Sequence, residues 1–396
     1  MHNEMENKTD ETMNRRQSVN IITLFLVLIF GFAAASLIAP KRTFSETENR
    51  TLQTMPAPKA DEVFSGKFGE KYEQYLSDQF PGRDGWIAVK TGVERAALRQ
   101  DSKGVYFAAD DYLIETHEGV FDTEQARAGI ADLSAFLGQL PETCDSGHLT
   151  AMVVPNAVDI LKDKLPPFAA PYDEEVYLEK IKDSLPDGVW YDAGDVLRRM
   201  AGEGEQVYYR TDHHWTTGAA FEVFADWAKG RGLGTFTAED YNITAVSDTF
   251  EGTIAAKVAQ TSVQDTIEIY EPVSASPLQV TYNGTETKDT VYAPDKLETR
   301  DQYAVFFGGN NAIVETRVGH SEPKGRSLLV LKDSYAHCFV PFTFSCFDRV
   351  DMVDLRYYNQ PLEELMEEKQ YTDILILYNA AGFAEDVSLA KLPGGA

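Results

Sequence analysis

The sequence predicts an α/β domain with a mostly parallel central sheet that is flanked by helices. Short, continuously apolar segments at 148–156, 327–334, 349–355 and 372–379 have the length of buried strands. Helical patterns separate these segments, and this alternation is typical of a parallel sheet that is covered on both faces. The segment QYAVFFGGN, residues 302–310, is predicted to be another strand of this kind.

The composition indicates a folded chain and excludes nucleic acid as a partner. The 396 residues are 43% hydrophobic, which is enough for one large domain or two modest ones. The formal net charge of −27 repels the phosphates of nucleic acid, and it equally disfavours an anionic lipid surface away from any anchor. We therefore expect no nucleic-acid partner.

Residues 19–39 form an apolar run that is long enough to span a membrane. The preceding tail, residues 1–18, contains Arg15 and Arg16. The positive-inside rule therefore predicts a cytoplasmic tail, a single-pass anchor in the cell membrane and an extracytoplasmic remainder. Lys41 and Arg42, which follow the run, weigh against this orientation.

A cleaved signal peptide is the alternative to an anchor. Ala33 and Ala35 form an A-x-A pattern before Ser36, which is a typical cleavage site. The apolar run is long for a signal peptide, so an uncleaved anchor is favoured.

Residues 40–62 are polar, with two prolines near the end, and are predicted to be an extracytoplasmic stem. The folded domain is predicted to cover residues 63–396. It begins with an amphipathic helix that ends near residues 80–82, because apolar residues recur every four positions from Phe64 to Leu76.

Three further segments complete the predicted domain. Residues 189–197 are predicted to be a strand that leads into a helix. Residues 216–232 are predicted to be a helix, with Thr216 or Thr217 as its N-cap. Residues 234–300 have no helical period and are predicted to be a β-rich insertion.

Ser334 lies where the predicted strand 327–334 meets a helical pattern, in the stretch SLLVLKDSYAHCFVPF. In open α/β sheets, ligands bind beyond the carboxyl ends of the strands. The N-terminus of a helix offers free N–H groups that stabilise the oxyanion formed when a serine attacks an ester. The position also fits a serine that only caps the helix.

A serine nucleophile needs a base, and the base needs a carboxylate that orients it. The stretch YYRTDHHWTTGAA supplies both, because Asp212 and His214 lie two residues apart. In an extended segment their side chains point to the same side, whereas His213 points away. The sequence therefore predicts a Ser334–His214–Asp212 triad, with a structural Asp–His pair as the alternative.

A metal site is the competing interpretation of this stretch. Asp212, His213 and His214 are possible ligands, with His337 as a fourth. Adjacent histidines in a strand point apart, and the sequence has no HExxH motif and no cysteine pair at zinc spacing. We therefore expect no metal. Cys338 and Cys346 could form a disulfide, although three cysteines define no framework.

The motif Asp212-His213-His214-Trp215 resembles the one that names the DHHW family of bacterial surface proteins. It is also similar to the D-x-H-W motif of the periplasmic alginate O-acetyltransferases, whose catalytic domain is SGNH hydrolase-like. The resemblance covers roughly residues 44–385 and is carried, in the same order, by YLSDQFPGRD (75–84), GVYF (104–107), VVPN (153–156), GGN (308–310), LKDSYAHCFVPF (331–342) and VDLRYY (353–358).

This resemblance implies an SGNH hydrolase-like fold in which the triad order is permuted, because Asp212 and His214 precede Ser334. Ser334 would be the nucleophile, His214 the general base and then acid, and Asp212 its orienting partner. The Ser334 N–H would belong to the oxyanion hole. Gly309 and Asn310 are the candidates for a second donor, with a plain turn as the alternative.

The resemblance also suggests residues that contact substrate. Arg356 is one candidate, and a structural ion pair with Asp354 or Asp333 is its alternative. Tyr208, Tyr209 and Trp215 are candidates for stacking on a sugar ring, and ordinary packing is the alternative for these aromatic residues.

The implied function is O-acetyl transfer to a polysaccharide, or hydrolysis of an acetyl ester, without a cofactor. A transferase outside the cell lacks cytosolic acetyl-CoA, so it would need a membrane-bound O-acyltransferase as its acetyl-donor partner. The main alternative is a non-catalytic protein that binds glycan or scaffolds polysaccharide assembly. A glycosidase is a third possibility, although no carboxylate pair stands out.

Overall fold

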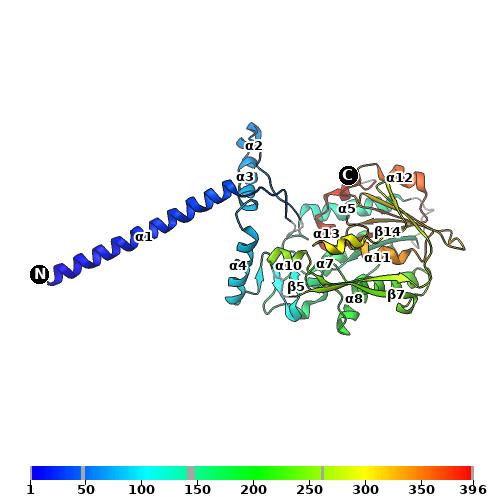
Figure 1. Cartoon of the computed structure of the whole chain (residues 1–396). Coiled ribbons are helices and arrows are strands. Elements are labelled where there is room, and N and C mark those ends of the chain that lie inside the picture. The colour runs from blue at the N-terminus through cyan, green and yellow to red at the C-terminus, as the bar shows by residue number, and fades with distance from the viewer. Residues whose placement is uncertain (1, 46–49, 141–147, 260–262, 394–396) are drawn as a thin grey trace. The chain divides into compact units, whose positions relative to one another are not determined.

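The computed structural model describes residues 2–45, 50–140, 148–259 and 263–393, without the side chains of 2–15, 44 and 50 (Figure 1). The chain forms two compact units, Met1–Lys90 and Thr91–Ala396. Most of the predicted tail, including Arg15, lies where side chains are not described, whereas Arg16 is described and exposed.

The described part of the first unit begins with a long helix, α1 (His2–Ile38), and shorter elements follow it. Within α1, Arg16–Ile38 is long and apolar enough to cross a membrane, and a signal sequence would meet the same criterion. The elements after it are the hairpin β1 (Phe44–Ser45) and β2 (Arg50–Thr51), and the helices α2 (Ala60–Phe64) and α3 (Lys67–Asp78).

The segment that was predicted to be a stem is held by hydrogen bonds to the end of α3. The Gln79 amide donates to the carbonyl oxygens of Arg42 and Gln53, at 2.8 and 3.1 Å. The Gln53 N–H donates to the Asp78 carboxylate at 2.8 Å. The predicted amphipathic helix is confirmed as α3, and a further helix, α4 (Arg83–Ala96), follows it.

The main sheet of the second unit has seven strands within the described residues, in the order β10-β9-β11-β13-β12-β14-β6. The four strands from β13 to β6 are parallel, whereas β10, β9 and β11 pair antiparallel. The strands are β6 (Leu149–Val154), β9 (Leu278–Tyr282), β10 (Glu286–Lys288), β11 (Ile313–Val318), β12 (Ser327–Lys332), β13 (Arg349–Val353) and β14 (Asp373–Asn379). The sheet is therefore mixed, and the predicted parallel arrangement holds for only one half.

Helices cover both faces of this sheet (Figure 1). Successive residues of β12 point to opposite faces: Leu328 and Val330 belong to one hydrophobic cluster, and Leu329 and Leu331 to the other. One cluster includes α8 (Ala193–Gly202), α9 (Thr217–Gly230) and α11 (Ala336–Thr343), and the other includes α5 (Glu124–Gln139), α7 (Glu174–Ser184) and α13 (Ala380–Glu385). This two-sided burial explains the continuous apolar character of the strands.

Residues 302–310 were predicted to form a strand, and this prediction is wrong. They form a 3₁₀ helix, Gln302–Val305, and a turn in which Phe307, Gly308 and Gly309 have positive φ. Phe306 and Phe307 are buried as core residues. The apolar run therefore reflects burial without sheet pairing, which periodicity alone cannot distinguish from a strand.

Residues 234–300 are β-rich, but they do not form a separate insertion. The antiparallel pair β7 (Tyr241–Phe250) and β8 (Asp265–Pro272) encloses a short helix, α10 (Thr253–Val258). The strands β9 and β10 join the main sheet. The other short elements are β3 (Asp101–Ser102), β4 (Val105–Phe107), β5 (Leu113–Glu115), α6 (Ala157–Ile160) and α12 (Leu362–Lys369).

A substitution at Phe339 tests how the helices pack on the sheet. Its ring is fully buried and contacts Trp215, Phe224 and Trp227. We expect Phe339→Ala to lower the free energy of unfolding by about 3–5 kcal/mol, because it leaves a cavity. The control, Phe168→Ala, removes a fully exposed ring and should change it by less than about 0.5 kcal/mol. Urea unfolding of the detergent-solubilised chain measures both, and equal effects would contradict the packing described.

Candidate active site

Ser334 lies in the turn between β12 and α11, as the sequence predicts. Asp333 fixes this turn. Its carboxylate accepts hydrogen bonds from the Tyr335 backbone N–H at 2.9 Å, from the Asn379 backbone N–H at 2.8 Å and from the Asn379 side-chain amide at 2.7 Å. The Ser334 side chain is half-buried. Within the described residues, the Ser334 backbone N–H donates to no hydrogen-bond acceptor. The turn thus presents a hydroxyl and a free N–H at the same point.

His214 connects Ser334 to Asp212. The His214 Nε2 lies 2.8 Å from the Ser334 Oγ, and its Nδ1 lies 2.5 Å from the Asp212 Oδ1. The same oxygen accepts the His214 backbone N–H at 3.0 Å. The structure therefore brings the three predicted residues into one chain of hydrogen bonds.

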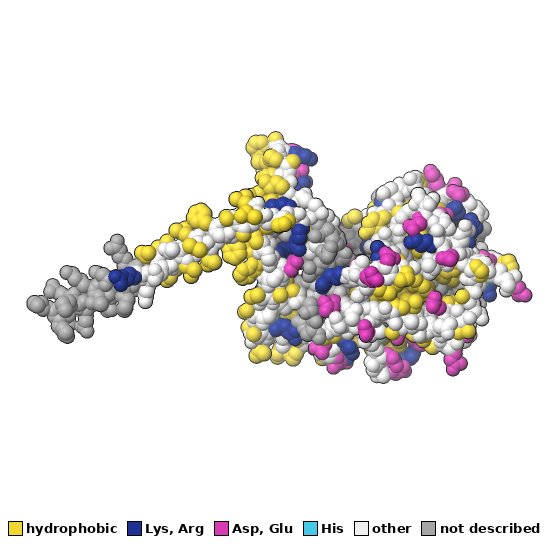
Figure 2. Space-filling model, viewed as in Figure 1, with side chains coloured by type: hydrophobic (Ala, Val, Ile, Leu, Met, Phe, Trp, Pro, Cys, Tyr) yellow, Lys and Arg dark blue, Asp and Glu magenta, His cyan; other side chains and the backbone are white. Residues whose placement is uncertain are grey.

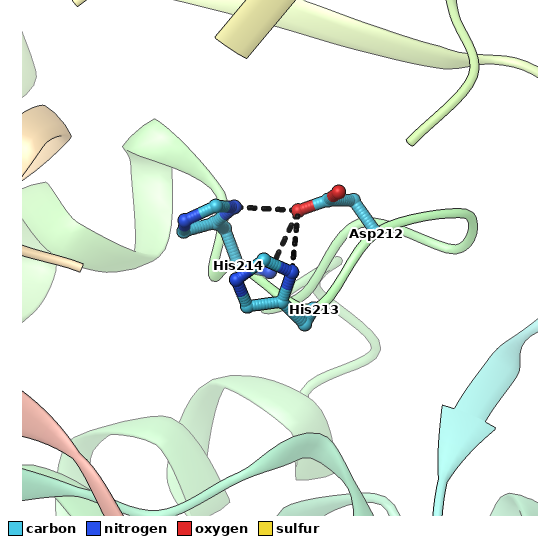
Figure 3. Close-up of side chains that lie close together, drawn as sticks. All are labelled: Asp212, His213 and His214. Atoms are coloured by element: carbon cyan, nitrogen blue, oxygen red, sulfur yellow. Dashed lines mark hydrogen bonds and ion pairs between the residues drawn. The ribbon is translucent and has the colours of Figure 1, made fainter. Parts of the chain in front are cut away.

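His213 does not point away from Asp212, so that prediction is wrong. Its Nδ1 lies 3.4 Å from the Asp212 Oδ1, and the two histidine rings are 3.9 Å apart (Figure 3). The reason is that residues 210–214 form a series of bends rather than an extended strand. Alternation of side chains holds only for extended backbone.

The other oxygen of Asp212 is held by Thr253, the first residue of α10. The Thr253 N–H and hydroxyl donate to the Asp212 Oδ2 at 2.8 and 2.9 Å. Gly252 permits this approach, because a Cβ at residue 252 would lie 2.2 Å from the Asp212 Cβ. No local pattern indicates this support, since residues 252–253 lie in a segment without a helical or strand period.

The electrostatics of the pair favour a neutral histidine beside a charged carboxylate. Burial raises the pKa of Asp212, but the neighbouring His213 and His214 more than offset this and hold it well below its usual range. Burial, reinforced by His213, lowers the pKa of His214 to about 4 despite the opposing effect of Asp212. A neutral His214 is able to accept a proton from Ser334 at neutral pH.

Aromatic side chains fix the orientation of the site. The Tyr303 ring stacks on His214 at 3.8 Å, and its hydroxyl donates to the Ser334 carbonyl oxygen at 3.3 Å. The Trp215 indole donates to the Tyr335 carbonyl oxygen at 2.9 Å. The Tyr335 hydroxyl donates to the His213 carbonyl oxygen at 2.5 Å. Sequence reasoning missed Tyr303, because its segment was predicted to be a strand.

The predicted sugar-stacking residues occupy buried positions. The side chains of Tyr208, Tyr209 and Trp215 belong to the main hydrophobic cluster, and each is at most 1% exposed. Trp215 packs between Tyr335 and Phe339. The structure thus shows packing for these rings, and substrate stacking stays a prediction.

Arg356 lies beyond the end of β13, beside the strand that leads to Ser334. Its Nε and Nη2 donate to both oxygens of Asp354 at 2.8 and 2.7 Å, and the side chain is partly exposed. This is the ion pair that the sequence offered as an alternative. Substrate binding by the exposed part of the guanidinium stays a prediction.

Asp354 also anchors a buried lysine that sequence reasoning missed. The Lys332 Nζ donates to Asp354 at 3.1 Å and lies 2.8 Å from the His337 Nε2. Burial and the charge of Lys332 hold the pKa of His337 well below its usual range, so His337 is a neutral acceptor. Among the described residues, His337 thus accepts a hydrogen bond from Lys332 and does not belong to the group of possible ligand atoms around Asp212.

Gly309 and Asn310 lie in the turn that follows the 3₁₀ helix. The Gly309 N–H donates to the Phe306 carbonyl oxygen at 3.2 Å, which is the bond of a tight turn. Asn310 is exposed. Over the described ranges, no hydrogen bond joins either residue to Ser334. A contribution to the oxyanion hole stays a prediction for both.

Two other sequence expectations concern metal and disulfide chemistry. The ligand atoms of Asp212, His213 and His214 lie within 4.8 Å of one another. A metal ion held by all three would have to replace the 2.5 Å hydrogen bond between Asp212 and His214.

Cys338 and Cys346 are buried free thiols, so the structure contains no bridge between them. Cys144 lies outside the described residues.

These observations define a Ser–His–Asp site at the carboxyl edge of the parallel strands of an α/β fold. Residues 188–353 match the model of the DHHW protein family, which confirms the resemblance drawn from the sequence. The match contains all three residues of the hydrogen-bonded chain.

Two of the similar solved structures, the first two described here, share the fold. A DHHW family protein from Eubacterium siraeum is 20% identical, with a TM-score of 0.58 over 74% of this chain and 95% of its own. Bacillus cereus PatB1 with a sulfonyl adduct is 18% identical, with a TM-score of 0.56 over 72% of this chain and 98% of its own. The O-acetyltransferase domain of Pseudomonas putida AlgJ is 13% identical, with a TM-score of 0.42 over 73% and 98%. The search of curated proteins gave no match.

The low pKa of His214 predicts how the reactivity of Ser334 depends on pH. Protonated His214 cannot accept the serine proton, so reactivity rises as pH passes through the folded pKa of about 4. We expect phenylmethylsulfonyl fluoride to modify Ser334 at a rate that reaches half its maximum near pH 4, as measured by intact mass. A midpoint near 6.5, the ordinary pKa of histidine, would contradict the burial of His214.

Thr253 is predicted to hold Asp212 in place. Thr253→Val removes the hydroxyl that donates to the Asp212 Oδ2 but keeps the shape of the side chain. We expect the sulfonylation rate of Ser334 to fall about tenfold, because one bond to a charged group is worth about 1.5–3 kcal/mol. Thr253→Ser keeps the hydroxyl and is the matched control. Equal rates for the two variants would show that the hydroxyl does not support Asp212.

Proposed function

We propose that this protein is a membrane-anchored serine acyl-transfer enzyme with an extracytoplasmic domain, and that it moves an acetyl group onto or off a polysaccharide. The observation that carries the proposal is the continuous chain from Ser334 through a neutral His214 to a charged Asp212. A strand-to-helix serine with such a base is suited to nucleophilic catalysis. The acetyl group and the polysaccharide rest on the family resemblance.

In the first step, the Ser334 Oγ attacks the carbonyl carbon of an acetyl ester. His214 takes the serine proton at Nε2, which lies 2.8 Å from the hydroxyl oxygen. Negative charge develops on the carbonyl oxygen, and the free Ser334 N–H donates to it. The intermediate then releases the donor alcohol, which leaves with the proton from His214, and an acetyl-serine remains.

In the second step, an acceptor hydroxyl attacks the acetyl-serine. His214 takes the proton of that hydroxyl and returns it to the Ser334 oxygen as the ester bond breaks. A sugar hydroxyl as acceptor gives an acetylated polysaccharide, whereas water gives acetate. Asp212 stays charged throughout and stabilises the imidazolium that forms in each step.

The acetyl donor has to reach the outer side of the membrane. The helix Arg16–Ile38 suits a single-pass anchor, which would keep the catalytic unit beside the membrane. We propose a membrane-bound O-acyltransferase as the partner that delivers the acetyl group to this side. An acetylesterase would need no such partner.

The proposal is tested with the full chain in detergent and p-nitrophenyl acetate as substrate. Ser334→Ala and His214→Ala should each reduce turnover on the order of 10³-fold or more, because they remove the nucleophile and the base. The wild-type chain should gain one acetyl group on Ser334, detected by intact mass and peptide mapping. Arg127→Ala, a substitution on the distant helix α5, is the control and should retain turnover.

Absence of turnover and of an adduct, with all variants folded, would contradict the enzymatic proposal. It would favour a protein that keeps the fold to bind glycan. In that case the Asp212–His214 pair would only tie its loop to the sheet.

A further inference from the structure

Exposed apolar side chains gather on the helices that directly follow the apolar span. Phe64 at the end of α2 is 91% exposed, and Trp86 in α4 is 51% exposed. We call the group the apolar platform, and it consists of Val63, Phe64, Leu76, Phe80, Trp86 and Val89. Figure 2 shows hydrophobic atoms along α1 and again over the region of α2 and α3. Exposed apolar side chains in such a group indicate a surface that is covered by something other than water.

Ring contacts connect the platform to the span itself. Phe32 lies inside the apolar segment Arg16–Ile38, and its ring stacks on Phe80 at 5.3 Å. The same ring meets the edge of Trp86 at 5.8 Å. Phe32 is six residues from the end of α1, which corresponds to about 9 Å along a helix. If α1 crosses a bilayer, Phe80 and Trp86 therefore lie where hydrocarbon meets the lipid headgroups.

The residue types suit this depth. Aromatic rings are enriched where a membrane protein meets the interface, and tryptophan is typical there. Interfacial helices combine such rings with a polar opposite face that contains lysine. α3 contains the half-buried aromatic residues Phe68, Tyr72 and Tyr75, and its Lys71 forms an ion pair with Glu62 at 2.8 Å.

Nearly all of the net negative charge of the chain lies in its second unit. Residues 1–90 contain eleven Lys and Arg against twelve Asp and Glu, whereas residues 91–396 contain 25 against 51. An anionic lipid surface repels the second unit, as the sequence indicates, but it does not repel the first. The near-neutral part of the chain is thus also the part that carries the span and the platform.

We propose that the apolar platform inserts into the interfacial layer of the bilayer that α1 crosses. Lipid is the partner, and Phe80 and Trp86 are its inner contacts, next to Phe32. The proposal rests on the anchor that is part of the proposed function. Its consequence is that the segment after the span lies bound along the membrane and is not a free stem.

Trp86 is a direct probe of this contact. The chain has four tryptophans, of which Trp215 and Trp227 are buried and Trp190 is half-buried. The full chain is reconstituted into phosphatidylcholine–phosphatidylglycerol vesicles with bromine at shallow positions of the acyl chains. We expect the brominated lipid to quench part of the fluorescence, and Trp86→Phe to reduce the quenched part at least twofold.

A pair of matched variants tests the rest of the platform. Phe64→Ser removes an exposed ring of the platform and is expected to weaken the quenching of Trp86 at least twofold. Phe168→Ser removes a fully exposed ring of the second unit and should leave the quenching unchanged. Equal effects of both substitutions would overturn the assignment of the platform to lipid.

The outcomes separate this inference from the proposals on which it rests. A chain that resists carbonate extraction but shows no quenching of Trp86 overturns the platform and leaves the anchor. A chain that does not stay in the vesicles overturns both. Trp86 that is unquenched by brominated lipid, yet protected from acrylamide in native membranes, identifies a protein partner and overturns the lipid assignment. The acetyl-serine assay is independent of all these results.

Discussion

The structure of the site depends on how one buried carboxylate is kept charged. Asp212 is 2% exposed, and burial of an ion without partners is strongly unfavourable. Four hydrogen-bond donors offset the cost of burying the Asp212 charge: the ring and backbone N–H groups of His214, and the backbone N–H and hydroxyl of Thr253. These donors come from two segments about 40 residues apart, so the carboxylate joins the DHHW loop to the start of α10. The close approach of Gly252 to Asp212 is a direct result of this requirement.

A row of polar side chains lies at the carboxyl ends of the four parallel strands. Asp354 follows β13, Asp333 follows β12, Asn379 ends β14, and Asn156 lies just beyond β6. The Asn379 amide donates to Asp333 at 2.7 Å, and the Asn156 amide donates to Asn379 at 3.0 Å. Each strand thus delivers a polar group to the same edge, and the hydrogen bonds between these groups fix the turn that carries Ser334.

The neutral state of His214 favours chemistry over a purely structural role. A tie between loop and sheet would be stronger with a charged imidazolium against Asp212. Instead, burial and His213 lower the pKa of His214 to about 4, which leaves Nε2 free to accept the Ser334 proton. The buried Lys332, between Asp354 and His337, places a second charged group close to the same turn without contacting Ser334. A neutral base within hydrogen-bond distance is what a serine nucleophile requires, and the state of His214 therefore supports the enzymatic proposal.

The sequence by itself determined the α/β class, the positions of the four parallel strands and the apolar span, and it offered Ser334, His214 and Asp212 as candidate site residues with structural roles as alternatives. These follow from local patterns, because a buried strand is continuously apolar and a triad needs particular residue types. The tertiary structure alone decided which distant groups support them: Thr253 on Asp212, Tyr303 on His214, and Lys332 with Asp354. It also turned His213 toward Asp212 and made the sheet mixed. The physical reason is that hydrogen bonds between residues tens of positions apart, and burial of an apolar run without strand pairing, leave no periodic trace in the sequence.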